Sequence, residues 1–217
     1  MRALGVCFLV FMLLFSCSNK KKETDSANAL KVMEKDLDNA NTIFTNRLKV
    51  LYEELKKNPM DKKVYNNIGD FYFKNGFVKN AKMFFYLALK IDSNYVPALF
   101  NLSVVYNYTG RYDSTIYCLE RIHKIEPDNI KALTNLSRFY YKKANLQKAL
   151  EYATLAYNKN PDDSNLCYNI GKIYEALKEY DLAKEYYEKA IELNKNNKKA
   201  EVSLKMLIHK LDNRNTK

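Results

Sequence analysis

The sequence predicts an all-α protein built from stacked helical hairpins, and three observations support this prediction. First, the stretch VYNNIGDFYFKNG, Val64–Gly76, recurs at a constant interval and without gaps at Ala98–Gly110, Ala132–Ala144 and Leu166–Lys178. Second, apolar residues in each copy fall three and four positions apart, which is the spacing of one helix face. Third, glycine and proline are scarce, with 5 and 4 among 217 residues. A fixed period of about 20–50 residues is typical of repeat architectures, in which neighbouring units bury a common core.

The recurring positions describe the apolar faces of two helices in each repeat. The first helix carries four columns: Tyr65, Leu99, Leu133 and Cys167; Ile68, Leu102, Leu136 and Ile170; Gly69, Ser103, Ser137 and Gly171; Tyr72, Tyr106, Tyr140 and Tyr174. The second helix carries three: Ala81, Thr115, Ala149 and Ala183; Phe85, Leu119, Ala153 and Tyr187; Ala88, Ile122, Ala156 and Ala190. Glycine inside a helix costs about 0.5–1 kcal/mol relative to alanine. We therefore interpret Gly69 as a position where the two helices pack closely.

Turn residues set the limits of the repeats. Gly76 and Gly110 follow first helices, Pro127 and Pro161 close two repeats, and Pro59 precedes the first. Proline ends helices because it lacks an N–H and clashes with the preceding turn. The predicted repeats span residues 62–95, 96–129, 130–163 and 164–197.

Further helices are expected on both sides of the repeats. Residues 29–61 form an N-terminal helical segment that resembles a degenerate repeat, with helix from about Leu30 to Lys57 and a break near Asp38–Asn41. Its heptad-like spacing also allows dimerisation, and the sequence does not define the oligomeric state. Residues 198–217 are expected to form a lysine-rich, amphipathic capping helix and tail, because the ends of solenoids need a polar cap.

This pattern resembles the tetratricopeptide repeat, a helix–turn–helix of about 34 residues with a small residue, tyrosine, alanine and proline at fixed places. The match covers Lys62–Asn197 as four repeats, with Thr115 in place of alanine and Ser93 and Lys195 in place of proline. The resemblance implies a right-handed α-solenoid whose first helices line a concave face. In this family that face binds proteins or peptides.

The amino terminus has the features of a lipoprotein signal peptide. Residues 3–16 follow Arg2 without a charge, and this stretch is shorter than the roughly 20 residues that a membrane span needs. It ends in LFSC, Leu14–Cys17, which resembles the bacterial lipobox although Phe15 departs from the usual small residue. The resemblance implies removal of residues 1–16 and lipidation of Cys17. The alternative is an uncleaved anchor with an incidental cysteine.

A polar tether is expected over residues 17–28. It contains Lys20, Lys21 and Lys22, which either lie against anionic headgroups or are simply solvated. If Cys17 is lipidated, the repeats work in the bacterial cell envelope, outside the cytoplasm. Ser18 is compatible with sorting to the outer membrane, and the leaflet is left open.

The expected concave face contains a column of asparagines and several basic residues. Asparagine amides offer both donors and an acceptor, which suits the backbone of an extended peptide, but the column can equally serve structural hydrogen bonds. Lys131, Asn135, Arg138 and Lys142 share one helix face, because they are spaced four, three and four apart. The candidate peptide-binding residues are Asn67, Asn101, Asn135, Asn169, Lys74, Tyr108, Lys131, Arg138, Lys142 and Lys172.

These residues match only in part the charge clamp with which some family members hold carboxy-terminal peptides. Two further clamp columns contain Asn66, Phe100, Thr134 and Tyr168, and Asp70, Val104, Arg138 and Lys172. No repeat offers the expected lysine and asparagine together in these columns, so the clamp is not carried over. A solvated lysine surface is the alternative.

The sequence offers little for catalysis or metal binding. It lacks a nucleophile elbow, a phosphate loop and an HExxH motif, and His123 and His209 are its two histidines. Cys118 and Cys167 lie in different repeats, have no CxxC partner, and are expected to be too far apart for a disulfide. We expect no enzymatic activity, no cofactor, no metal and no nucleic-acid partner.

These observations favour a lipid-anchored scaffold that binds a protein or peptide, of acidic character, through the concave face. The net charge of +11 supports a second hypothesis, in which a basic surface binds an anionic polymer or a membrane. The sequence does not name the partner or the pathway.

Overall fold

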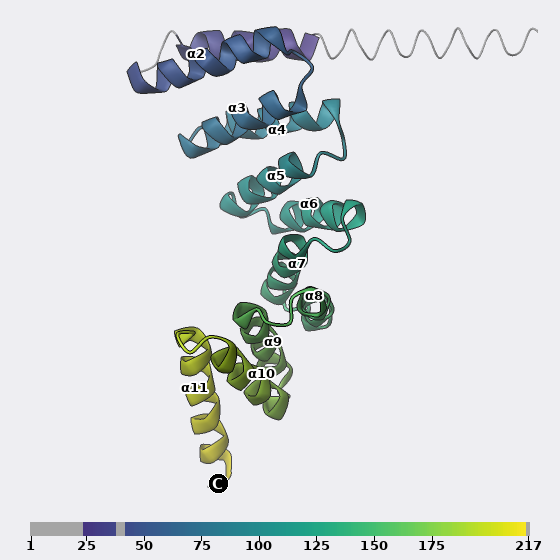
Figure 1. Ribbon diagram of the computed structural model, residues 1–217, viewed down its shortest axis with the longest axis vertical. Helices are drawn as coiled ribbons and strands as arrows, with labels where there is room; N and C mark the ends of the chain where they lie inside the picture. Colours follow the sequence, from purple (N-terminus) through teal and green to yellow (C-terminus); the bar gives the residue numbers. More distant parts are fainter. Residues whose placement is uncertain (1–23, 38–41, 216–217) are drawn as a thin grey trace, which may run out of the picture. The chain divides into compact units, whose positions relative to one another are not determined.

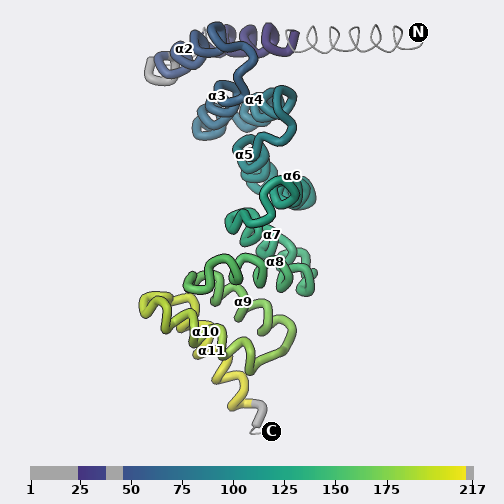
Figure 2. The backbone as a smooth tube through the Cα atoms, turned by 45° about the vertical axis from the view of Figure 1, so that its right-hand side comes forward, coloured from purple at the N-terminus to yellow at the C-terminus, as the bar shows by residue number. Residues whose placement is uncertain are grey.

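A computed structural model describes residues 24–37 and 42–215, and all regular secondary structure in these ranges is α-helical (Figures 1 and 2). The described chain divides into two compact units that meet in sequence between Arg111 and Tyr112. The N-terminal unit contains a helix over residues 24–37, here called the N-terminal helix, followed by α2 (Thr42–Lys57), α3 (Lys62–Lys74), α4 (Val78–Ile91) and α5 (Val96–Tyr108). The C-terminal unit contains α6 (Tyr112–Ile125), α7 (Ile130–Lys142), α8 (Leu146–Lys159), α9 (Ser164–Leu177), α10 (Tyr180–Leu193) and α11 (Lys198–Asn215). None of the helices in the described ranges is both long and apolar enough to cross a membrane.

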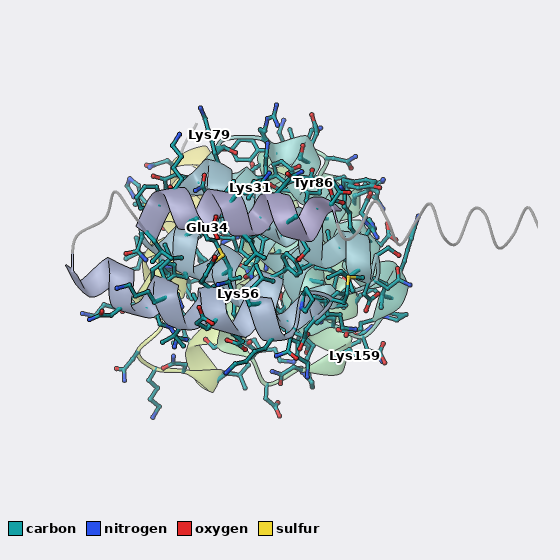
Figure 3. All side chains as sticks on the ribbon, turned by 90° about the horizontal axis from the view of Figure 1, so that it is seen from above. Lys31, Glu34, Lys56, Lys79, Tyr86 and Lys159 are labelled. Atoms are coloured by element: carbon teal, nitrogen blue, oxygen red, sulfur yellow. The ribbon has the colours of Figure 1, made fainter. Side chains whose placement is uncertain are left out.

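The N-terminal unit begins with two helices that lie side by side. Figure 3 shows Glu34 between the N-terminal helix and α2, where its carboxylate accepts a hydrogen bond from the Tyr52 hydroxyl. Each of the two helices contributes a fully buried side chain, Met33 from the N-terminal helix and Leu55 from α2. The sequence predicts helix from about Leu30 to Lys57 with a break near Asp38–Asn41, and that break lies outside the described residues.

The N-terminal helix starts earlier than the sequence predicts. Residues 24–28 belong to the expected tether, but they are helical. Ser26 is buried, and Asp25 forms a 2.6 Å ion pair with Lys90 of α4. The prediction is wrong for these residues because the buried face continues from Met33 through Ala29 to a serine. A search for apolar residues does not count serine as part of such a face.

Helices α3 and α4 pack closely at Gly69, as the sequence predicts. A Cβ atom at Gly69 would lie 2.6 Å from Cε1 and 2.7 Å from Cδ1 of Phe85. The Tyr72 ring stacks on Phe84 with ring centres 5.3 Å apart, and its hydroxyl donates a 2.8 Å hydrogen bond to Asp36. The same carboxylate accepts a 2.9 Å hydrogen bond from the Asn80 amide, so Asp36 links the N-terminal helix to both α3 and α4.

The turn within each repeat uses a left-handed residue at one recurring position. Gly76 and Gly110 have φ values of 83° and 72°. The equivalent positions in the third and fourth repeats are Ala144 and Lys178, whose φ values are 57° and 67°. All four residues therefore adopt the same left-handed conformation, although only glycine adopts it without a steric cost.

The C-terminal unit repeats the packing seen at Gly69. A Cβ atom at Gly171 would lie 2.7 Å from Cδ1 and Cε1 of Tyr187, and the Tyr187 hydroxyl donates a 2.7 Å hydrogen bond to Glu175. Ser164 donates a 2.7 Å hydrogen bond to the Ala190 carbonyl, and Asn197 donates one of 2.7 Å to Ser164. These bonds join the start of α9 to α10 and to the loop between α10 and α11.

Helix α11 covers one end of this packing. Leu207 is fully buried against Ala183 and Tyr187. The outer side of α11 is less polar than the sequence predicts for a capping helix. The exposed fractions of Val202, Met206 and Ile208 are 50%, 66% and 40%. The lysines that made the sequence look polar are interspersed with these apolar residues instead of forming a separate outer face.

Candidate functional site

The C-terminal unit contains a small cavity between α7 and α9, two helices that pack against each other. We call it the α7–α9 pocket. Its volume is about 50 Å³, and it is lined by Ser137, Arg138 and Tyr141 of α7 and by Asn169, Lys172 and Ile173 of α9. Arg138, Asn169 and Lys172 are candidate binding residues from the sequence, and the structure brings these three together.

The repeat period explains why two cations meet at this pocket. Arg138 and Lys172 occupy the same position in the first helices of successive repeats. The Lys172 ammonium lies 5.0 Å from the centre of the Tyr141 ring, and the Arg138 guanidinium lies 5.2 Å from that of Phe139. Cations within about 6 Å of an aromatic face are attracted to it, so these rings hold the two charges near the pocket.

No acidic side chain neutralises these charges within the part of the chain that the structure describes. Arg138, Lys142 and Lys172 have no ion pair there. Lys142 instead lies 5.2 Å from the centre of the Tyr112 ring and 5.4 Å from that of Phe139. An anionic group entering the pocket would therefore meet two cations that do not need to be released from a carboxylate.

The asparagine column is partly engaged within the chain. In α5, the Asn101 amide donates a 2.9 Å hydrogen bond to the side chain of Asn66. In α7, the Asn135 amide donates a 2.8 Å bond to the Lys131 carbonyl, and its oxygen accepts a 2.7 Å bond from Arg138. Asn135 thus orients the Arg138 guanidinium beside the pocket. The asparagine column predicted a direct contact with a peptide and did not indicate this indirect role.

The other candidates lie away from this pocket or have local partners. In the N-terminal unit, Lys74 forms a 2.7 Å ion pair with Asp70, four residues earlier on the same helix. Tyr108 is 71% exposed, and its ring meets that of Phe73 edge to face at 5.7 Å. Asn67 and Lys131 are exposed on α3 and α7.

Sequence reasoning missed the aromatic side chains that accompany the cations. Tyr141 lines the pocket and contacts Lys172, and Phe139 contacts both Arg138 and Lys142. The signal was present in the sequence, because the stretch RFYYK of α7 places three aromatics between two of the candidate cations. Of these three aromatics, the repeat columns include only Tyr140, as a core residue, and they assign no role to Phe139 or Tyr141.

The two described cysteines are buried free thiols. Burial raises the pKa of the Cys118 thiol to about 11, so this thiol is neutral and unreactive near pH 7. His123 lies 3.2 Å from the Pro127 carbonyl, and His209 lies 3.0 Å from the Asn213 amide. Across residues 24–37 and 42–215, no three potential ligands of the types His, Cys, Asp and Glu gather at one point.

Comparisons with known proteins agree with this architecture. The sequence model of the family described as "Tetratricopeptide repeat" matches residues 62–95 and 164–197. No curated protein matches the sequence. The chain therefore contains tetratricopeptide repeats within an all-α helical repeat fold.

Several solved structures share this fold. A MamA protein is 24% identical, with a TM-score of 0.64 over 68% of this chain and 81% of that chain. MamA from Desulfovibrio magneticus RS-1, residues 41 to the end, is 19% identical, with a TM-score of 0.66 over 71% and 88%. PilF of Pseudomonas aeruginosa is 24% identical, with a TM-score of 0.61 over 70% and 69%. At these identities the likeness concerns the fold alone.

Proposed function

We propose that the protein is a non-enzymatic interaction scaffold that binds a protein or peptide through a carboxylate held at the α7–α9 pocket. The observation that carries this proposal is the pair of cations, Arg138 and Lys172, which flank one pocket without an acidic partner among the described residues. The tetratricopeptide repeats support the general role, because helical repeats create extended surfaces that bind other proteins.

The chemistry of the pocket fits one acidic side chain or a chain terminus. Its volume of about 50 Å³ is too small for a large ligand but sufficient for a carboxylate group. Arginine can bind a carboxylate through two parallel hydrogen bonds, and charge-assisted bonds are about twice as strong as neutral ones. The Asn169 amide adds donors and an acceptor beside the cations, which suits the backbone that carries the acidic group.

We further propose that the protein works in the bacterial cell envelope, attached to a membrane by a lipid. The stretch Leu14–Cys17 supports lipidation of Cys17 and anchoring of the chain in a bacterial membrane, and Ser18 supports the outer membrane. These residues lie outside the described ranges. Metabolic labelling with a radioactive fatty acid tests this part, because a Cys17→Ala chain should lose the label and accumulate with residues 1–16 attached.

Binding of an anionic polymer or a membrane by the basic surface as a whole is a second candidate function. The net charge of +11 favours it. Such binding would fall steeply with added salt and would not depend on peptide sequence. A pocket-specific interaction would instead depend on Arg138 and Lys172 more than on total charge.

A cross-linked pulldown from native membranes tests the pocket. The test variant is Arg138→Glu/Lys172→Glu. The control is Lys124→Glu/Lys195→Glu, which changes the net charge equally at two exposed residues. We expect a partner that is recovered with the wild type and the control but lost with the test variant, while circular dichroism shows that all three are folded. Equal loss in both variants would favour the whole-surface alternative, and an unchanged partner list would refute the pocket assignment.

A further inference from the structure

Helix α11 exposes two neighbouring apolar side chains that the proposed function does not use. Val202 and Met206 are both at least half exposed. They are four residues apart in the helix and therefore lie on the same side of it. We call this pair of residues the α11 surface. Neighbouring exposed apolar groups, unlike a single one, mark a candidate contact with another molecule.

The repeat period relates the α11 surface to the α7–α9 pocket. Arg138 and Lys172 line that pocket and are one period apart, and Met206 occupies the equivalent position one period later. Val202 is likewise one period after Tyr168 of α9. The column that supplies the two cations of the pocket therefore continues onto α11, where it holds an apolar side chain.

Packing between α9 and α11 keeps this register in space. Tyr168 of α9 packs against the buried cluster that contains Tyr187 of α10 and Leu207 of α11. The 2.7 Å hydrogen bond from Asn197 to Ser164 fixes the start of α9 to the loop before α11. Helices α7, α9 and α11 belong to the same compact unit (Figure 1). One extended ligand can therefore contact the pocket and the α11 surface together.

The α11 surface differs from the side of α11 on which a further helix would pack. In the fourth repeat, Cys167 and Gly171 are buried on the side of α9 that packs against α10. The equivalent residues of α11 are Glu201 and Lys205, which are exposed and form a 2.6 Å ion pair. Burying such charged groups is costly, so this side of α11 suits solvent. The α11 surface carries no charge of its own and suits burial by a ligand.

Charge favours an acidic peptide over a second copy of the chain on this surface. Lys199 and Lys210 lie on the same side of α11 as Met206, because they are seven residues before and four residues after it. Two copies that met through their α11 surfaces would bring these lysines together, and like charges oppose such contact. An acidic segment would meet complementary charge both here and in the pocket.

We propose that the partner is a peptide segment whose acidic group lies in the α7–α9 pocket while an apolar side chain packs on the α11 surface. This inference rests on the proposed function and adds a second recognition element to it. Axes of packed helices are about 8–10 Å apart, and three residues of extended chain span about 10 Å. The acidic and the apolar residue of the partner should therefore be about three positions apart.

The test uses the full chain in a non-ionic detergent and fluorescein-labelled octapeptides of glycine and serine, with binding read by fluorescence anisotropy. The first peptide carries an aspartate and a leucine three positions apart, and it is made with the pair in either order. The second has serine in place of leucine, and the third has asparagine in place of aspartate. We expect the first peptide, in one of its two orders, to bind roughly tenfold more tightly than the second, because leucine buries apolar surface. The third peptide should lose most of the affinity.

The test variant is Val202→Ser/Met206→Ser. It should bind the leucine and serine peptides equally, because the apolar contact is lost while the pocket is intact. The control variant is Val50→Ser/Ile208→Ser, which replaces two exposed aliphatic residues outside the α11 surface. This control should keep the tenfold preference for leucine. All four residues are at least 40% exposed, so circular dichroism should show that both variants are folded.

The peptides separate this inference from the proposed function. Binding that needs aspartate but gains nothing from leucine would overturn the inference and leave the carboxylate pocket in place. A leucine preference that survives Val202→Ser/Met206→Ser, or that is lost equally in the control variant, would do the same. Absence of any aspartate-dependent binding would refute the pocket and, with it, this inference.

Two other occupants of the α11 surface would also overturn the inference. Self-association in sedimentation equilibrium that is abolished by Val202→Ser/Met206→Ser would indicate a second copy of the chain. Loss of the leucine preference on addition of bicelles of phosphatidylcholine with phosphatidylglycerol, but not of phosphatidylcholine alone, would indicate an anionic membrane. We expect neither result.

Discussion

Substitution of Gly69 by alanine tests the packing that defines the repeat. The added Cβ atom would lie 2.6, 2.7 and 3.1 Å from three carbons of the Phe85 ring. Non-bonded carbons are most stable at about 3.5–4.0 Å, so the ring or the helix must move by about 0.9 Å or more. Phe85 is 1% exposed and therefore has little free space into which to move.

Two opposing effects determine the magnitude. Alanine in place of glycine stabilises a helix interior by about 1 kcal/mol. Overpacking of a dense core costs about 1–3 kcal/mol, and sometimes more, and contacts as short as these belong at the upper end. We expect a net loss of about 2 kcal/mol in the free energy of unfolding. The sign of the change in the free energy of unfolding is informative by itself, because helix propensity alone predicts that Gly69→Ala stabilises the chain.

The assay is urea unfolding of the full chain, followed by circular dichroism, within a double-mutant cycle. The second substitution is Phe85→Leu, since the second repeat carries Ser103 and Leu119 at these two positions. In the double variant, Gly69→Ala should cost at least about 1 kcal/mol less than in the wild type. Ser137→Ala is the control, because that position already has a Cβ atom, and its effect should stay below about 1 kcal/mol. Additive effects, or a Gly69→Ala chain more stable than the wild type, would refute the reasoning.

Three further predictions concern turns, alkaline stability and thiol reactivity. Ala144→Gly and Lys178→Gly should each stabilise the chain by about 1 kcal/mol in urea unfolding, because both residues have positive φ; a lower midpoint would contradict this. Burial first, and then the hydrogen bond to Glu120, raises the pKa of Tyr140 to about 12, so folding favours its neutral form. The contribution of Tyr140 to the free energy of unfolding should be complete below pH 10 and be lost as the pH rises toward 12. In Tyr140→Phe, the stability should therefore fall less steeply over that pH range. Cys118, 3% exposed and with a pKa of about 11, should resist iodoacetamide in the folded chain and react after unfolding, as read by peptide mapping.

The fold could be predicted from the sequence where one physical requirement recurs at a fixed spacing. Gly69 and Gly171 each face an aromatic ring, and the constant repeat period revealed both positions together. Prediction failed where a polar residue is buried or where the backbone conformation does not depend on the side chain. The N-terminal helix extends to residue 24 through buried Ser26, and the positive φ of Ala144 and Lys178 follows from the turn geometry and not from their side chains.

The candidate site also contains some features that the sequence predicts and others that only the structure reveals. The period placed Arg138 and Lys172 on neighbouring helices, and the structure brings them to one pocket. The pairing of Lys74 with Asp70 could have been read from their spacing of four residues, which is a favourable geometry on a helix. The contact between Asn101 and Asn66 could not, because it depends on how two helices of different repeats meet.

Comparison among the repeats of one chain separates positions that the fold requires from positions that are free to serve binding. Tyr72, Tyr106, Tyr140 and Tyr174 recur because each repeat packs a tyrosine ring at this position, buried in the first three repeats and partly buried in the fourth. The position of Arg138 and Lys172, by contrast, holds Asp70 and Val104 in the other two repeats, and the position of Lys79 holds Asp113 and Asp181. A backbone that accepts acidic, apolar and basic residues at one position exerts no preference there. The fold therefore does not explain why Arg138 and Lys172 line one pocket, and the proposed binding of a carboxylate offers an explanation that the charge-matched variants of that pocket can test.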